Sequence, residues 1–283
     1  MNIPQVLLVD NGSIQPRATL NLRHLAAELS QCSGSRVHPV SLQHADRIPN
    51  DQLDGNPAQL LKSFLSTQLN HGSRDFLIVP LFFGVSRALT SLIPSLVESL
   101  QSKHGLFQLH IADVLYPQPQ GEPRLVSILK DQIDPLIAGV VQPRVILVDH
   151  GSPLREVAEV RSRIASELRN LLPSETHFLE AVMERREGSE YDFNGERLEQ
   201  ILEREAQLNQ HTPIAISLLF LLPGRHAGQG GDIASICRET EQRYPGLKID
   251  ITPLVGEHPQ LIGILRDRLE SGLKAMPSTQ DHV

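Results

Sequence analysis

Two histidines and a glutamate follow successive apolar runs in the second half of this 283-residue sequence, and side chains of these types could bind a metal ion or move protons. His150 and Glu184 directly follow the first two runs, and His226 comes shortly after the third, 214–222. A neutral imidazole can hold a metal or accept a proton, and two imidazoles with a carboxylate suit divalent ions of borderline softness. If the runs are parallel strands, the three side chains converge at one edge of a sheet.

Each of these residues also has an ordinary structural explanation. A histidine at a strand end is often only a hydrogen-bonded cap, and Glu184 could form a surface ion pair with Arg185 or Arg186. The glycine-rich segment 224–231 could be a flexible turn, with Asp232 capping the following helix. The common placement of the three residues at successive strand ends favours a shared site.

Other kinds of site lack their motifs. The glycine-rich turn has neither the G-x-G-x-x-G spacing of dinucleotide-binding sites nor a P-loop, so no nucleotide is expected. Ser152 lacks the G-x-S-x-G context of a hydrolase nucleophile, and both it and Asp149 recur in the first half as Ser13 and Asp10, which indicates a role in the turn.

Composition narrows the class further. The net charge of −7 argues against nucleic acid as the main partner, because phosphate binding needs a basic face. Two cysteines make no disulfide framework, and we expect a cytoplasmic protein. No export signal is recognisable at the N-terminus, and the longest apolar run is too short to span a membrane.

The elements that would position the site occur twice. Val6 to Ser13 reappears as 145–152, and a helical stretch and a second apolar run follow each copy at an offset of about 139 residues. This predicts a duplication with one domain over residues 1–141 and another over 142–283. Apolar runs that alternate with amphipathic stretches predict an α/β fold with two tandem parallel-sheet lobes. In the second half we expect strands near 144–149, 177–183, 213–222 and 247–253, and helices near 155–171, 194–209, 230–243 and 258–273.

The first half serves as an internal control for the chemistry. Asn11 stands where the second half has His150, and our alignment places Gln43 opposite Glu184 and Ala88 opposite His226. None of these three replacements can exchange a proton near neutral pH. The first copy is therefore predicted to keep the scaffold with a degenerate site, and the second copy to carry the active one.

These motifs resemble the CbiX/SirB sirohydrochlorin chelatases, class II chelatases that insert Co²⁺ or Fe²⁺ into a tetrapyrrole without ATP. The resemblance in the second half rests on the His-Gly-Ser of 150–152, on Met183-Glu184 and on the Gly-Arg-His within 218–233. In the first half, 80–94 aligns with the same pattern but has Ala88 and Leu92 at the His and Asp positions. The resemblance implies a chelatase-like, flavodoxin-like fold of two similar lobes with a cleft between them.

The resemblance also implies a function. The expected reaction is insertion of Co²⁺ or Fe²⁺, with Ni²⁺ as a further candidate, into a sirohydrochlorin-type tetrapyrrole of cobalamin or siroheme biosynthesis. His150, His226 and Glu184 would be catalytic, the two histidines would hold the metal, and Glu180 on the same strand could replace Glu184. Anionic substrate carboxylates would contact residues near these strand ends, namely Arg225, Arg185, Arg186, Arg155, Ser152 and Asn11.

Two other functions stay open at this point. A carrier of the same fold would bind a metal or a tetrapyrrole with these residues but without turnover. A metal-dependent hydrolase with Asp149 and His150 as ligands is the third hypothesis, although no second cluster with bridging spacing is evident. Because the duplication supplies both lobes, a monomer could contain a complete site.

Overall fold

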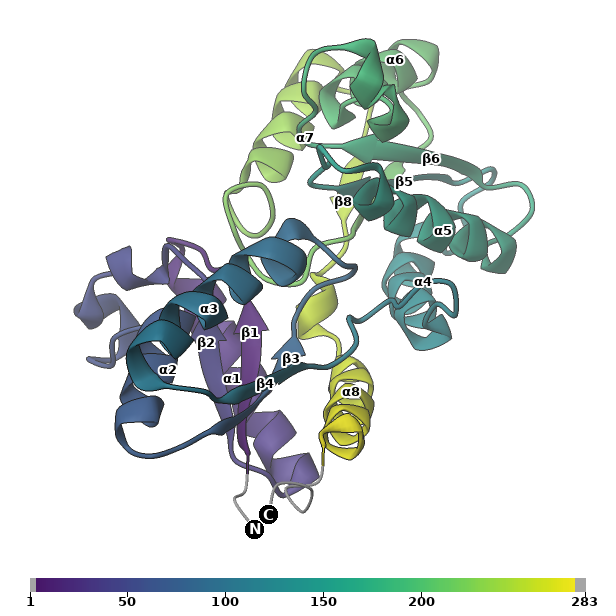
Figure 1. The fold of residues 1–283 in the computed structure, drawn as a ribbon. Coiled ribbons are helices and arrows are strands. Elements are labelled where there is room, and N and C mark those ends of the chain that lie inside the picture. The colour runs from purple at the N-terminus through teal and green to yellow at the C-terminus, as the bar shows by residue number, and fades with distance from the viewer. Residues whose placement is uncertain (1–3, 278–283) are drawn as a thin grey trace. The chain divides into compact units, whose positions relative to one another are not determined.

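The computed structural model describes residues 4–277, which form two four-stranded sheets with all neighbouring strands parallel and with helices on both faces (Figure 1). The first sheet has the order β2-β1-β3-β4 and the second has the equivalent order β6-β5-β7-β8, which confirms the predicted fold class. The strands are β1 (Gln5–Asp10), β2 (Val37–Ser41), β3 (Asp75–Pro80), β4 (Gln108–Ile111), β5 (Arg144–Asp149), β6 (His177–Val182), β7 (Ile214–Leu218) and β8 (Ile249–Ile251).

Helices connect the strands as parallel topology requires. The α-helices are α1 (Pro16–Ser33), α2 (Leu61–Asn70), α3 (Ile93–His104), α4 (Pro123–Ile137), α5 (Arg155–Leu171), α6 (Leu198–Leu208), α7 (Asp232–Arg243) and α8 (Leu261–Ala275). Shorter helical turns are η1 (Ala45–Arg47), η2 (Asn50–Leu53), the π-helical η3 (Ala88–Leu92), η4 (Ser189–Asn194) and η5 (Val255–Glu257). No helix between residues 4 and 277 has the length and apolar character needed to cross a bilayer.

Both sheets are buried on two faces, which explains why their central strands read as unbroken apolar runs. In the first sheet Leu7 and Val9 pack in one core with residues of α2 and α3, while Leu8, on the opposite face of β1, is also fully buried. In the second sheet Ile146 and Val148 pack equivalently against α6 and α7. Successive side chains on a strand point to opposite faces, so each face needs its own helical layer.

The last helix of each sequence copy does not stay with its own copy. One structural unit comprises the chain up to Gly121 together with the segment from Pro259 onward, and the other unit is Glu122–His258. Helix α8 therefore belongs to the first unit, where Gly272 lies against Leu77 of β3, and α4 packs on α5 and β7 in the second unit. These units follow the packing of the helices, whereas the predicted domains, 1–141 and 142–283, follow the repeat in the sequence.

Candidate metal centre

His150, Glu184 and His226 converge at the carboxyl edge of the second sheet. His150 directly follows β5, Glu184 follows β6, and His226 lies in the loop between β7 and α7. Each offers a ligand atom, and these atoms all lie within 4.8 Å of one another. No other group of three or more His, Cys, Asp or Glu side chains converges in this way among residues 4–277. Strand order reverses between β5 and β7, and this edge is where open parallel sheets bind ligands.

A glycine brings the first two of these residues together. Gly151 has a φ of +86°, and a Cβ atom built there would lie 2.0 Å from the carbonyl oxygen of Glu184. Only glycine permits so close an approach together with that backbone conformation. The Glu184 backbone N–H donates to the carbonyl oxygen of His150 at 3.0 Å, so the turns after β5 and β6 are held as one unit.

A carboxylate orients the His226 ring. The His226 side chain is only 8% exposed, and its Nδ1 lies 2.9 Å from Oδ2 of Asp232, the first residue of α7. A carboxylate only accepts, so Nδ1 carries the hydrogen in this 2.9 Å contact. Nε2 lies 3.4 Å from Oε1 of Glu184. Metal-binding histidines commonly donate their second ring N–H to a carboxylate in this way, so Asp232 does more than cap a helix.

His150 has the same tautomer for a different reason. Its Nδ1 lies 3.2 Å from the carbonyl oxygen of Gly151, an acceptor, which places the hydrogen on Nδ1 and leaves Nε2 unprotonated in the neutral ring. The His150 and His226 rings have centroids 4.8 Å apart and planes inclined by 72°. Both rings therefore have one nitrogen engaged by the protein and the other available to a metal.

The spacing of the donor atoms fits a small divalent ion. Two ligand atoms with metal bonds of about 2.0–2.2 Å in tetrahedral geometry lie about 3.3–3.5 Å apart. The separation of 3.4 Å between His226 Nε2 and Glu184 Oε1 meets this spacing already. Because His150 is exposed, a small rotation of its side chain can complete a three-ligand set. Such a set leaves coordination positions open for a substrate.

A buried arginine fixes the turn that carries His150. Arg161 of α5 is 3% exposed, and its Nη1 lies 2.9 Å from Oδ1 of Asp149. The same carboxylate oxygen accepts from the Gly151 N–H, and Arg161 also donates to the carbonyl oxygen of Asn194. Burial raises the pKa of Asp149, and the Arg161 guanidinium opposes that shift. The network therefore supports the turn from inside the unit.

Ser152 and Glu180 belong to this supporting structure. The Ser152 backbone N–H and C=O are both bound by the Asn194 side chain at 2.9 Å, and the Ser152 hydroxyl accepts from the Leu154 N–H. Glu180 faces α5, where its Oε2 accepts from Arg161 Nε at 3.2 Å and from the Ser162 hydroxyl. Glu184 and not Glu180 is therefore the carboxylate grouped with the two histidines.

The four predicted arginines lie near this edge and already have partners. Arg225 is 77% exposed and lies between Glu184 Oε1 and Asp232 Oδ2, at 3.4 and 3.3 Å. Arg185 pairs with Asp192 at 2.5 Å. Arg155 and Arg186 stack on aromatic rings of η4, with guanidinium carbons 4.8 Å from the Phe193 centroid and 5.8 Å from the Tyr191 centroid.

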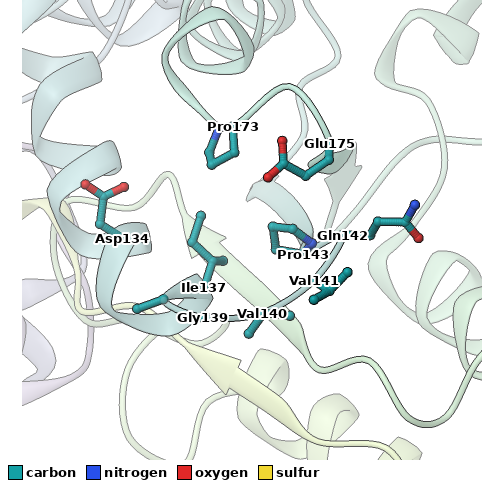
Figure 2. Close-up of a pocket in the computed structure, with 10 residues that line it drawn as sticks. Asp134, Ile137, Gly139, Val140, Val141, Gln142, Pro143, Pro173 and Glu175 are labelled. Carbon is teal, nitrogen blue, oxygen red and sulfur yellow. The ribbon is translucent and has the colours of Figure 1, made fainter.

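The remaining predicted residue, Asn11, lies in the other unit. It lines a pocket of about 510 Å³ at the carboxyl edge of the first sheet, together with Gln43 and Ala88. A different pocket of about 640 Å³ lies at the opposite, amino end of β5 in the second unit (Figure 2). Its lining comes from the end of α4 and the loops before β5 and β6, so it is remote from the histidines.

Sequence reasoning missed the residues that hold the site in place. Asp232 was named only as a helix cap and as a position of the family pattern, and Arg161 and Asn194 were not singled out. One signal was present: α5 carries Arg161 on a face whose other residues, Ala158, Ile164 and Leu168, are buried and apolar. The equivalent position in α1 is the buried Leu22.

Comparisons with known proteins agree with this fold. The CbiX family model matches residues 5–135 and again 144–272. No protein with a curated description matches. The chain is similar to a solved structure of SirB from Bacillus subtilis with Fe³⁺, with a TM-score of 0.68 and 14% identity over 95% of this chain and 96% of that one.

Two further structures are similar over almost their full length. One is the sirohydrochlorin chelatase SirB from Bacillus subtilis subspecies spizizenii in complex with cobalt, with a TM-score of 0.67, 14% identity, and 96% of each chain covered. The other is CbiX, described as the terminal enzyme for biosynthesis of siroheme in denitrifying bacteria, with a TM-score of 0.55, 16% identity, and 96% of this chain and 100% of that one covered. Since both halves match the family model, this chain belongs to the CbiX/SirB sirohydrochlorin chelatase family, in its two-lobed form.

Proposed function

We propose that this chain inserts Co²⁺ or Fe²⁺ into a sirohydrochlorin-type tetrapyrrole without ATP, and that the second copy performs the chemistry. The observation that carries the proposal is the convergence of His150, Glu184 and His226 within 4.8 Å. In both histidines Nδ1 contacts a hydrogen-bond acceptor of the protein, which leaves Nε2 as the candidate ligand atom and adds to this support. The similar SirB structures, one with Fe³⁺ and one with cobalt, support these two metals.

Each residue of the cluster has a distinct part in the proposed reaction. The metal ion is a substrate, held by Nε2 of His150 and of His226 and released as bonds to the ring nitrogens replace these ligands. Two pyrrole N–H bonds break as the ion binds the four ring nitrogens, so two protons must leave the ring, and their loss balances the charge of the divalent ion. Glu184 is half-exposed and beside His226, and it accepts the two protons one after the other and passes each to solvent.

Charged groups around the cluster suit an anionic substrate. Arg225, 77% exposed, can exchange its contact with Glu184 for a carboxylate of the tetrapyrrole. Arg155 and Arg186 stack on the η4 rings with planar guanidinium groups that can donate bidentate hydrogen bonds to carboxylates. These residues place cationic groups at the edge of a chain whose net charge is −7.

An anaerobic metallation assay tests the proposal. Sirohydrochlorin is mixed with Co²⁺, Fe²⁺ or Ni²⁺, and the change in its absorption spectrum is followed with and without the protein. His150→Ala should remove the protein-dependent rate. The matched control is His211→Ala, which removes an exposed histidine before β7, at the opposite edge of the same sheet.

The alternatives predict different results. A carrier would bind Co²⁺ or the tetrapyrrole in a His150-dependent way but would not raise the metallation rate. A metal-dependent hydrolase would cleave a phosphoester when metal is added. Equal rates with the wild-type chain and with His150→Ala would contradict the assignment of the reaction to the second copy.

A further inference from the structure

The first copy keeps the arginine of the metal centre but lacks both of its acidic partners. In the second unit Arg225 lies between Glu184 and Asp232. The aligned residues of the first copy are Arg87, Gln43 and Leu92. Among residues 4–277, no ion pair or side-chain hydrogen bond involves Arg87.

Arg87 lines the pocket at the carboxyl edge of the first sheet. The pocket has a volume of about 510 Å³, and its polar lining is otherwise uncharged: Asn11, Gln43, Ser91 and Ser95. Asn11 and Gln43 lie at the ends of β1 and β2, and the two serines follow β3, on the turn η3 and helix α3. Amide and hydroxyl groups can donate hydrogen bonds to an anion without competing for the guanidinium. The lining therefore suits a carboxylate and offers no ligand set for a metal.

Exposed apolar side chains lie at the same edge of this sheet. Ile14 follows β1, Val85 follows β3, and Leu92 ends η3 and also lines the pocket; all three are exposed. Large apolar side chains grouped at one edge commonly mark a binding surface. An isolated small anion would not need them, but a flat ring that carries carboxylates would use both the apolar residues and the arginine.

We propose that the degenerate copy is an anion subsite, in which Arg87 binds a carboxylate of a planar polycarboxylate while Asn11 and Gln43 complete the contact. Duplication followed by loss of Glu184 and Asp232 equivalents converts a metal-binding edge into a carboxylate-binding one. The planar ligand class rests on the proposed function, whereas the carboxylate chemistry rests on the pocket alone. Arg87 is here a binding residue with no part in metal coordination.

Binding of uroporphyrin, a metal-free porphyrin with eight carboxylates, tests this directly in the full-length chain by fluorescence. Arg87→Gln should raise the Kd about tenfold, as loss of a charge-assisted hydrogen bond predicts. Arg87→Lys keeps the charge but not the fork and should have a smaller effect. The control Arg36→Gln makes the same change of charge at the amino end of β2 and should leave the Kd unchanged.

A reverse variant makes the test sharper. Gln43→Glu restores the acidic neighbour that Arg225 has in the second copy, and it should weaken uroporphyrin binding about as much as Arg87→Gln does. Co²⁺ binding, measured by absorption of the protein-bound ion, should be unaffected by Arg87→Gln.

The same titrations in a His150→Ala background separate this proposal from the proposed function, because the Arg87 effect should persist when the metal centre is removed. A Kd for Arg87→Gln within twofold of the wild-type value, or an equal loss with Arg36→Gln, would overturn the subsite.

Discussion

The two copies keep one backbone and differ in the polar groups at its edge. Both place a glycine with positive φ after the first strand, and a Cβ there would come within 2.0 Å of a carbonyl oxygen in either copy, of Gln43 or of Glu184. The backbone bond between the two turns is also retained, from Gln43 to Asn11 and from Glu184 to His150. The fold therefore depends on the turn geometry, whereas the chemistry depends on side chains that the turn presents.

The difference extends below the surface to the aspartate that ends each first strand. Asp149 is paired with the buried Arg161, but the equivalent Asp10 faces an α1 that carries Leu22 in that place. Oδ1 of Asp10 is buried without a hydrogen-bond partner, and burial raises its pKa to about 6. The copy with the His-Glu-His group thus has an aspartate paired with an arginine, and in the other copy no ion pair of the described residues involves the equivalent aspartate.

The largest expected difference between the copies is in metallation. The double variant His150→Ala/His226→Ala should lower the rate by about 10²–10⁴-fold, the range expected for a lost acid–base or ligand group. Asn11→Ala should lower it by about fivefold or less, since Asn11 contributes only neutral hydrogen bonds. Equal losses in the two variants, measured by the anaerobic assay, would mean that both copies take part in the chemistry.

Much of this fold could be predicted because the strands are buried on both faces. The predicted strand 144–149 coincides with β5, and the predicted helix 155–171 coincides with α5. The third strand was predicted to reach residue 222 but ends at Leu218. The neighbouring β8 covers only Ile249–Ile251, and beyond it the carbonyl oxygens of Phe220 and Leu221 accept from the backbone of the helical turn η5. An apolar run indicates that its residues are buried, but buried residues need not form a strand.

Two features could not be predicted in the same way: which sheet a helix covers, and which side chains an arginine contacts. The amphipathic pattern of α4 and α8 shows that each covers a sheet, but not which sheet, so the exchange of these helices was missed. Arg185 and Arg155 were predicted near the site, yet their contacts with Asp192 and Phe193 depend on the path of η4. In contrast, the three strand-end residues were predictable because parallel topology brings successive strand ends to one edge.

The second-largest expected effect, after the one on metallation, is on the stability of the folded protein and concerns Asp10. Its folded pKa of about 6 exceeds the ordinary value of 3.8, so the folded state holds the proton more tightly than the unfolded chain does. This contribution to stability is complete below about pH 4 and is lost as the pH rises to about 6, with a total near 3 kcal/mol. Asp10→Asn cannot ionise, so its stability relative to wild type should rise over this interval, as urea unfolding at several pH values would show. A pH-independent difference would mean that Asp10 stays charged when folded.

The same substitution in the second copy should act in the opposite direction. Asp149→Asn removes a carboxylate from the buried Arg161, which keeps Glu180 and the Asn194 carbonyl as partners. We expect a loss of about 2 kcal/mol at pH 7, the cost of a hydrogen bond to a charged group. Hydrogen exchange in β5 and β1 can follow each unit separately. Stabilisation by Asp149→Asn would contradict the role assigned to Arg161.

The smallest expected effect concerns Asp232, whose contact with Nδ1 distinguishes His226 from an ordinary buried histidine. Asp232→Asn replaces the carboxylate that accepts from His226 Nδ1 with an amide that can either accept or donate, so the ring loses its fixed tautomer. Co²⁺ affinity should fall about tenfold, at the lower end of the range for such outer carboxylates. The control Asp192→Asn removes a carboxylate that pairs with Arg185 and does not contact either histidine. This variant should bind Co²⁺ with the affinity of the wild type. If both variants bind Co²⁺ equally well, Asp232 only begins α7, and the second copy then differs from the first in its ligands alone.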